Sequence, residues 1–380
     1  MQRRHDLDWL RVIVFALLIL YHVGMFFVPW GWHIKNEVIY PWLRYPMLFL
    51  SQWRLHILFV ISGMGTWYAL SRRSGRQFVA ERLRRLFVPL FFGILFIVPP
   101  QIYFERLDKG QFSGDYFSFW WNEAFTHGVY PKGNISYHHL WFVAYLLIYS
   151  LVLAPLFVYW RKNPDTWLLR MVRSIARTRF GLFWLIIPLY LWESLLEPFF
   201  PVTNAFWGDW FWVTNMATHF LYGFLLISSG DAFWETVKTH RRTYALLGVV
   251  AFCANLLFWF AIDDSPFVHF TEAFFKVFNT WTWILAIFGY AATYLNRPSP
   301  FLRYANEAVY PFYILHQTII IALGFICMHY HWGFLPKYLF MAFGTFIIAG
   351  ILYEFLIRRI AFLRPLFGLA PRKRGSTERK

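Results

Sequence analysis

The first apolar segment carries the residues with the clearest chemical potential. His22 follows Arg11 by eleven residues, a spacing that in an α-helix returns to within about 20° of the same face, roughly 16 Å along the axis. One helix then presents a cation at one membrane surface and an imidazole deep in the membrane. Imidazole accepts and returns a proton near neutral pH, so His22 is a candidate general base. A snorkelling arginine and a histidine bonded to a neighbouring helix are the alternatives.

A second candidate site is the arginine pair Arg82 and Arg85, which precedes Pro89. The spacing places both guanidinium groups on one helical face just below the membrane. Two guanidiniums in that arrangement can clamp phosphate groups bidentately. Arginines that only mark membrane topology would show the same pattern.

Other apolar segments also contain polar residues, and each of these must face a cavity, a partner or the interface. Arg54 opens the second segment, which contains Ser62, and His139 opens the fourth. The ninth contains Pro311, which we expect to loosen the helix and leave backbone carbonyls to line a cavity. The polar residues around this proline are Asn306, Glu307 and His316.

No metal or bound cofactor is expected. The two cysteines, Cys253 and Cys327, lie within apolar runs, and the paired histidines His329 and His331 do not have the spacing of convergent ligands. The chain also contains no glycine-rich phosphate loop and no nucleic-acid-binding motif. A nucleic-acid partner is therefore not expected.

Composition indicates which elements must position these residues. The chain has 380 residues, 58% hydrophobic and 15% charged, whereas a soluble domain has about 25% charged residues. A soluble or disordered protein is therefore excluded. Ten apolar stretches are long enough to cross a bilayer as helices, which predicts an all-α integral membrane protein with a single domain over residues 1–380. They are 12–29, 55–70, 86–104, 140–160, 180–196, 210–230, 243–262, 274–295, 308–329 and 335–357.

The basic residues support this topology. Ten crossings leave 28 of the 36 Lys and Arg residues on the side of the amino terminus and 8 on the other side. Cytoplasmic segments carry an excess of Lys and Arg, so both termini are predicted to be cytoplasmic, with a short basic tail at 358–380. The net charge of +16 is therefore interpreted first as a topology signal, and a bound polyanion is the second interpretation. The longest segment outside the membrane, 105–138, is expected on the outer side, as a cap over a site or a mobile connection.

Several motifs in order along the chain resemble the membrane acyltransferase-3 family. They are Leu7-Asp8-Trp9-Leu10-Arg11 with His22, Phe59-Val60-Ile61-Ser62-Gly63, Arg82-x-x-Arg85, His139-Leu140-Trp141-Phe142 and Tyr313-Ile314-Leu315-His316. A narrower resemblance, to members that add succinyl groups to periplasmic glucans, rests on further matches. These are Trp32-His33-Ile34-Lys35-Asn36, Arg54, Asn306 and Ile351-Leu352-Tyr353-Glu354.

The resemblance implies a ten-helix acyltransferase in the bacterial cytoplasmic (inner) membrane. Such an enzyme takes an acetyl or succinyl group from cytoplasmic acyl-CoA and delivers it to a hydroxyl of an extracytoplasmic glycan, with a periplasmic glucan as one acceptor. His22 matches the family's essential histidine and Arg11 its partner arginine. Arg82 and Arg85 match the cytoplasmic arginine pair, which would bind the donor. For the thioester oxyanion, Asn306, Ser62 or His316 can supply a hydrogen-bond donor, and Arg54 is a candidate cation for a succinyl group.

Two other functions fit the same polytopic pattern. A transporter or flippase for a glycan-linked or lipid-linked substrate would also need a buried histidine, buried carboxylates and a proline within a helix. A catalytically silent subunit that recruits a glycan synthase is the third reading. Consumption of acyl-CoA by the purified protein separates the enzyme from both alternatives.

Overall fold

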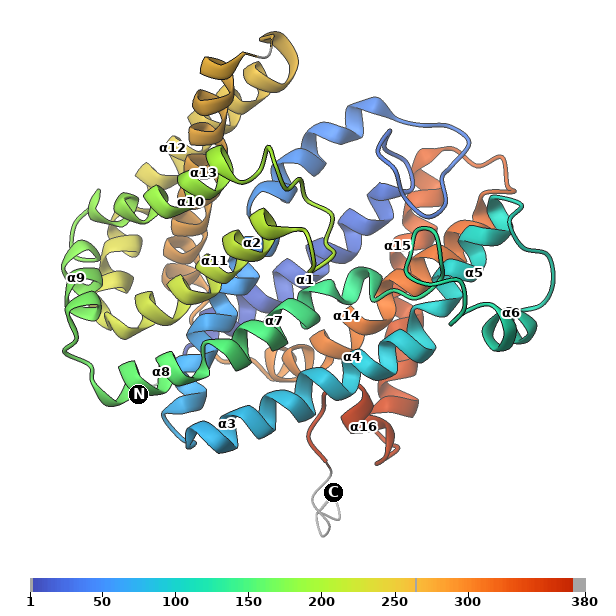
Figure 1. Ribbon diagram of the computed structural model, residues 1–380, viewed down its shortest axis with the longest axis horizontal. Coiled ribbons are helices and arrows are strands. Elements are labelled where there is room, and N and C mark those ends of the chain that lie inside the picture. The colour runs from blue at the N-terminus through green and yellow to red at the C-terminus, as the bar shows by residue number, and fades with distance from the viewer. Residues whose placement is uncertain (1–2, 264, 372–380) are drawn as a thin grey trace. The chain divides into compact units, whose positions relative to one another are not determined.

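The computed structural model describes residues 3–263 and 265–371, and its regular secondary structure there is entirely helical (Figure 1). The α-helices are α1 (His5–Met25), α2 (Arg44–Leu70), α3 (Gly75–Arg82), α4 (Val88–Phe92), α5 (Pro99–Asp108), α6 (Tyr116–Asn122), α7 (Trp141–Val152), α8 (Ala154–Lys162), α9 (Trp167–Ile175), α10 (Ile186–Leu195), α11 (Trp210–Ser228), α12 (Asp231–Ala261), α13 (Pro266–Tyr294), α14 (Pro300–Cys327), α15 (Phe334–Ile351) and α16 (Leu363–Leu366).

Short helices of other types connect or extend these elements. Three are 3₁₀ turns: η1 (Pro41–Leu43), η4 (His138–Leu140) and η5 (Gly181–Leu185). Three are π segments: η2 (Leu83–Phe87), η3 (Gly93–Ile97) and η6 (Leu352–Ile357). Because η2 and η3 join α3, α4 and α5, residues 75–108 form one long helical run. Such π segments are often found at functional sites, and η2 contains Arg85.

Within the described residues, six helices or helical runs are long and apolar enough to cross a membrane. A seventh is added if α7 and α8, which meet at a bend of 52°, form one span. The six are His5–Met25, Pro41–Leu70, Gly75–Asp108, Asp231–Ala261, Pro300–Cys327 and Phe334–Ile357. A multi-pass membrane protein is therefore supported, while the count of ten spans and the side of the termini stay predictions.

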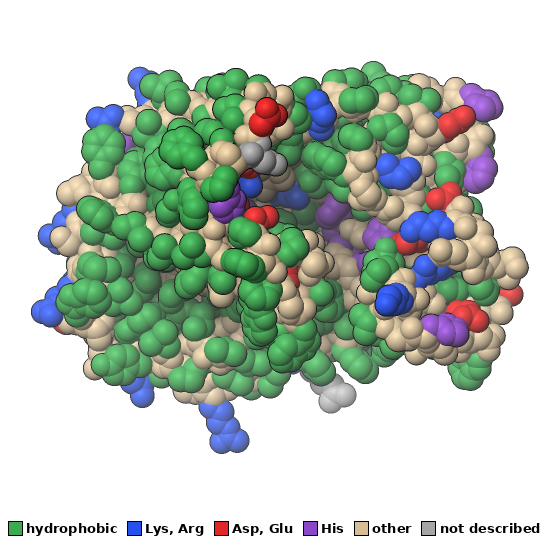
Figure 2. All heavy atoms as spheres, turned by 45° about the horizontal axis from the view of Figure 1, so that its top comes forward, with side chains coloured by type: hydrophobic (Ala, Val, Ile, Leu, Met, Phe, Trp, Pro, Cys, Tyr) green, Lys and Arg blue, Asp and Glu red, His purple; other side chains and the backbone are tan. Residues whose placement is uncertain are grey.

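Helices also occupy the other three predicted spans, but they are not among these candidates. The run of η5 and α10, Gly181–Leu195, is too short. Helices α11 and α13 are long enough, at 19 and 29 residues. Their polar residues therefore make them less hydrophobic than the six candidate spans. Hydrophobic side chains are spread over much of the face shown in Figure 2. Helix α12 has several exposed hydrophobic residues, including Leu246, Val250 and Leu257. An apolar surface of this kind suits lipid as its surroundings.

Several helix boundaries differ from those predicted by hydropathy. Helix α1 ends at Met25. The apolar residues Phe26, Phe27 and Val28, which hydropathy added to the helix, form a buried turn after it. Helix α2 begins at Arg44 instead of 55, and the polar residues Ser51, Gln52 and Arg54 just before the predicted start lie within it. Helix α14 remains one helix through Pro311, because a membrane helix tolerates the loss of a single backbone donor.

The chain divides into two compact units that are interleaved in sequence. The first unit comprises the chain up to Val14, Leu48–Val79 and Ile148–Leu302, and the second comprises Phe15–Met47, Ala80–Leu147 and the chain from Arg303 on. Within the first unit, α12 and α13 pack along each other as consecutive antiparallel helices (Figure 1). The single domain expected over residues 1–380 stays a prediction.

Glycines set the closest helix contact in the first unit. A Cβ atom at Gly63 of α2 would overlap the Phe220 carbonyl oxygen of α11, and one at Gly223 would overlap the Val60 carbonyl oxygen. Small residues let helix backbones approach in this way. The Ser62-Gly63 motif therefore has a packing role.

In the second unit, residues 109–137 form an ordered segment around Arg106. The Arg106 guanidinium donates to the Asn134 side chain at 3.1 Å and to the carbonyl oxygens of Pro131 and Gly133 at 2.8 and 3.0 Å. Helix α6 lies within this segment and is capped by Asp115, which accepts from two backbone N–H groups. These contacts order the segment, while its role as a cap over a site stays a prediction.

Candidate active site

In the second unit, α1 and α14 bring His22 and His316 into contact. The His22 Nδ1 atom lies 2.8 Å from the His316 Nε2 atom. The rings stack with 23° between their planes and 5.0 Å between their centroids. Residues 294 positions apart in sequence are thereby joined by one hydrogen bond.

The neighbouring carbonyl determines which nitrogen of each ring carries hydrogen. His316 Nδ1 lies 2.5 Å from the Tyr313 carbonyl oxygen, and a carbonyl oxygen only accepts hydrogen bonds. His316 Nδ1 therefore donates, and its Nε2 accepts from His22 Nδ1 when both rings are neutral. This assignment leaves the lone pair of His22 on Nε2, where a general base needs it.

His139 lies beside this pair and is held in a similar way. Its Nε2 donates to the Ile314 carbonyl oxygen at 2.9 Å, and its Nδ1 accepts from the Gln101 amide at 3.2 Å. The His139 ring stands nearly perpendicular to that of His316, with 5.1 Å between the centroids. The structure thus gathers three of the predicted site residues, His22, His139 and His316, in one place.

A second hydrogen-bonded chain starts at His139 and runs through residues that the sequence analysis did not select. Gln317 donates to Gln101 Oε1 at 3.0 Å and to His33 Nε2 at 3.1 Å. His33 Nδ1 then lies 2.5 Å from Glu105 Oε2. Gln101, Gln317 and Glu105 are all buried. Their hydrogen bonds to one another therefore take the place of the hydrogen bonds to water that burial removes.

The chain ends at Glu105, whose charge is balanced by its neighbours. Lys109 donates to Glu105 Oε1 at 2.6 Å and the Tyr130 hydroxyl donates to the same oxygen at 3.0 Å. Burial, together with the nearby Glu105 carboxylate, raises the pKa of Tyr130 to about 12. Tyr130 therefore stays protonated and acts as a donor near neutral pH.

The segment that carries His33 is fixed by two lysines. Lys35 donates to the carbonyl oxygens of Met25 at 2.7 Å and Trp30 at 3.0 Å, and also to that of Val28. These groups lie at or just after the end of α1, where carbonyls lack helical partners. Lys337 of α15 donates to Asn36 at 2.8 Å. Burial lowers the pKa of Lys35 to about 8.

The arginine pair lies at the other end of the run 75–108. Arg82 is the last residue of α3 and Arg85 lies in η2. The Arg85 guanidinium lies 3.3 Å from the carboxylate of Glu81 in α3. Gln101 follows Arg85 by sixteen residues, which at 1.5 Å per residue is about 24 Å along the run. The basic end and the histidine cluster are therefore well separated.

Arg11 and His22 share α1, as the spacing predicts. Arg11 belongs to the part of α1 that lies in the first unit, where it pairs with Asp8 at 3.6 Å. Ser62 and Arg54 also lie in the first unit. The Ser62 hydroxyl donates to the Leu58 carbonyl oxygen of its own helix at 2.7 Å, and Arg54 is buried.

Asn306 and Glu307 are not part of the histidine cluster. Asn306 precedes His316 by ten residues in α14, which is about 15 Å along the helix. Glu307 is exposed and lies 3.4 Å from Arg364. Both residues therefore lie closer to the start of α14 than the catalytic candidates.

The residues that sequence analysis missed had only weak signals. His33 stood in a motif and Gln317 follows His316 directly, whereas Gln101 lies inside the predicted span 86–104 and Glu105 begins the predicted outer segment 105–138. No group of three or more His, Cys, Asp or Glu side chains among residues 3–263 and 265–371 is arranged to hold a metal ion.

Comparisons with known proteins identify the family of this chain. A family model described as an acyltransferase domain matches residues 4–354. Proteins named glucans biosynthesis protein C from Salmonella paratyphi B, Salmonella agona and Salmonella enteritidis are each 25% identical to this chain, over 97% of it and 95% of the relative. No solved structure matches. The chain therefore belongs to the acyltransferase-3 family of membrane proteins and is an acyltransferase that transfers groups other than amino-acyl groups.

Proposed function

We propose that this protein, in the bacterial cytoplasmic membrane, transfers an acetyl or succinyl group from cytoplasmic acyl-CoA to a hydroxyl of an extracytoplasmic glycan. The relatives' name supports a glucan as the acceptor. The observation that carries the proposal is the hydrogen-bonded series from His22 through His316 to the Tyr313 carbonyl. That series sets the tautomer of His22, with hydrogen on Nδ1 and the lone pair on Nε2.

In the proposed step, His22 Nε2 removes the proton of the acceptor hydroxyl as its oxygen attacks the thioester carbonyl carbon. The tetrahedral intermediate collapses, the carbon–sulfur bond breaks, and CoA leaves as a thiolate that takes the proton from the His22 imidazolium. Because His316 accepts from His22 Nδ1, it stabilises that imidazolium. A covalent acyl-His22 intermediate is the alternative route.

We propose a positioning role for His316 in place of an oxyanion-stabilising one. Its Nδ1 hydrogen is directed to the Tyr313 carbonyl, so a neutral His316 has no second hydrogen to donate to a substrate. The Ser62 hydroxyl is likewise directed to a backbone carbonyl. Asn306 lies about 15 Å along α14 from His316, which does not favour it as the oxyanion donor.

The donor site proposed for CoA is the basic end of the 75–108 run. Arg82 and Arg85 would hold its phosphates, while Arg11 adds positive charge on the side of the membrane predicted to be cytoplasmic. The pantetheine arm would then extend toward the histidine cluster. No other cofactor is proposed.

Release of free CoA by the purified protein tests this function. Acetyl-CoA and succinyl-CoA are each supplied with and without a glucan acceptor, and wild type is compared with His22→Ala. Release that needs both acceptor and His22 is expected. A general base contributes about 10²–10⁴-fold to the rate, so His22→Ala is expected to lose activity by that factor.

The matched control is His127→Ala, because His127 is exposed and lies outside the cluster. Its activity is expected to equal that of wild type. Full turnover by a correctly inserted His22→Ala variant contradicts the mechanism. Transmembrane movement of a glycan without CoA release contradicts the enzyme and favours the transporter.

A further inference from the structure

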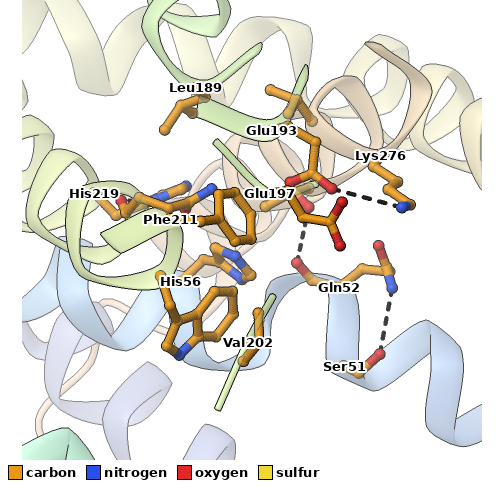
Figure 3. Close-up of a pocket in the computed structure, with 14 residues that line it drawn as sticks. Ser51, Gln52, His56, Leu189, Glu193, Glu197, Val202, Phe211, His219 and Lys276 are labelled. Atoms are coloured by element: carbon orange, nitrogen blue, oxygen red, sulfur yellow. Dashed lines mark hydrogen bonds and ion pairs between the residues drawn. The ribbon is translucent and has the colours of Figure 1, made fainter. Parts of the chain in front are cut away.

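The first unit contains a cavity of about 270 Å³ that the proposed chemistry does not use (Figure 3). Helices α2, α10, α11 and α13 surround it. His56, His219 and Phe211 lie on one side, and Glu193, Glu197 and Lys276 lie on the other (Figure 3). Some of the polar residues that lower the hydropathy of α11 and α13 therefore line this cavity.

Three buried polar atoms of the lining have no hydrogen-bond partner within the described part of the chain. They are His56 Nδ1, His219 Nε2 and Asn215 Oδ1, and their residues are 7%, 1% and 3% exposed. His219 Nδ1 donates to the Asn215 carbonyl oxygen at 2.9 Å, so neutral His219 presents a lone pair on Nε2. Buried polar groups in folded proteins are normally hydrogen-bonded, which indicates that the cavity receives a molecule that donates hydrogen bonds.

The charges of the lining restrict the class of this molecule. Glu193 lies 3.6 Å from Lys276, which also pairs with Glu272 at 2.8 Å. Glu197 is a second lining carboxylate, so the lining has two carboxylates and one ammonium group. This balance disfavours an anion such as acyl-CoA.

Neutral hydroxyl groups match the lining best. Each hydroxyl donates one hydrogen bond and accepts others, so it can donate to His219, Asn215 or a carboxylate and accept from the Gln52 amide. The aromatic rings of Phe211 and Trp212 offer apolar surface for the carbon skeleton that carries such hydroxyls. Sugars combine these two features.

The size of the cavity and its predicted location agree with a sugar. Sites for drug-sized ligands span about 300–1,000 Å³, so this smaller cavity suits one unit of a longer chain. The distribution of Lys and Arg predicts that the start of α2 and the end of α10 face the extracytoplasmic side. We propose that this cavity binds one glycosyl unit of a neutral glycan, as a recognition site that requires no acyl donor.

Binding of a neutral glucose tetrasaccharide to the full-length protein, without acyl-CoA, tests the proposal. The protein is held in nanodiscs, because the sugar headgroups of maltoside detergents would compete. Saturable binding is expected to wild type. Asn215→Leu and Gln52→Ala are each expected to weaken it about tenfold or more, while the exposed-residue variant His127→Ala leaves it unchanged.

Two charged tetrasaccharides test the ligand class. A uronic acid tetrasaccharide is expected to bind more weakly than the neutral one, because it meets Glu193 and Glu197. A glucosamine tetrasaccharide that binds more tightly than the neutral sugar overturns the proposal in favour of a cation site. Absence of neutral-sugar binding to folded wild type, or equal binding by correctly folded Asn215→Leu and Gln52→Ala, also overturns it.

This test is independent of acyl transfer. Loss of CoA release in His22→Ala with retained sugar binding supports both proposals. Loss of sugar binding with retained CoA release contradicts the recognition site alone.

Discussion

The Nδ1 atom of His22 lies 2.8 Å from the Nε2 atom of His316. Because the Tyr313 carbonyl fixes the hydrogen of His316 on the opposite nitrogen, this contact also fixes the tautomer of His22. In the proposed mechanism, His316 takes the orienting position that a carboxylate occupies in many catalytic triads.

His316→Ala is expected to lower kcat by about 10²-fold, the lower end of the range for general base catalysis, because His22 loses its orienting acceptor. KM for acyl-CoA is expected to change little. His316→Gln keeps an acceptor oxygen and is expected to recover part of kcat. Steady-state CoA release measures both variants, and an unchanged kcat in His316→Ala contradicts the positioning role.

Arg85→Gln is expected to raise KM for acyl-CoA about tenfold with kcat retained. A hydrogen bond to a charged group contributes about 1.5–3 kcal/mol, and 1.4 kcal/mol corresponds to a factor of ten. The adjacent Arg84→Gln is the matched control, since Arg84 is also exposed in η2. Equal effects of the two substitutions would assign Arg85 a general electrostatic role in place of phosphate binding.

Gly223→Ala and Gly63→Ala are each expected to destabilise the protein by about 1–3 kcal/mol, the usual cost of overpacking. In both cases the new Cβ overlaps a carbonyl oxygen of the neighbouring helix. Gly31→Ala is the control, because a Cβ there meets nothing within 4 Å. Thermal unfolding in detergent measures the difference, and wild-type midpoints for Gly63→Ala and Gly223→Ala would argue against the close contact between α2 and α11.

Lys35 gives a pH dependence of known sign. Burial lowers its pKa from 10.5 to about 8, so between these values the unfolded chain binds more protons than the folded one. Its contribution to stability therefore rises with pH across that window. Unfolding midpoints from pH 7.5 to 10.5 are expected to rise less steeply in Lys35→Met than in wild type.

The control for this experiment is Lys132→Met, because Lys132 is exposed. Its profile is expected to follow that of wild type. Parallel profiles of wild type and Lys35→Met would show that Lys35 titrates alike in the folded and unfolded states.

The sequence alone determined the elements and the features that depend on local spacing. Hydropathy located a helix at each of the ten predicted segments, because apolar composition acts over one helix at a time. The shared helix of Arg11 and His22 followed from helical periodicity. Boundaries were less accurate at α2 and α12. Both helices begin before the predicted starts at 55 and 243 and extend through polar residues such as Arg54 and Arg242.

Only the tertiary structure decided which distant side chains meet. His22 and His316, or Gln101 and Gln317, are joined through the packing of separate helices, and sequence spacing carries no information about the register between helices. The same holds for Glu105, which begins the segment predicted to lie outside the membrane but which is buried against His33 and Tyr130. Periodicity determines which face of a helix a residue occupies, whereas packing against other helices determines what that face contacts.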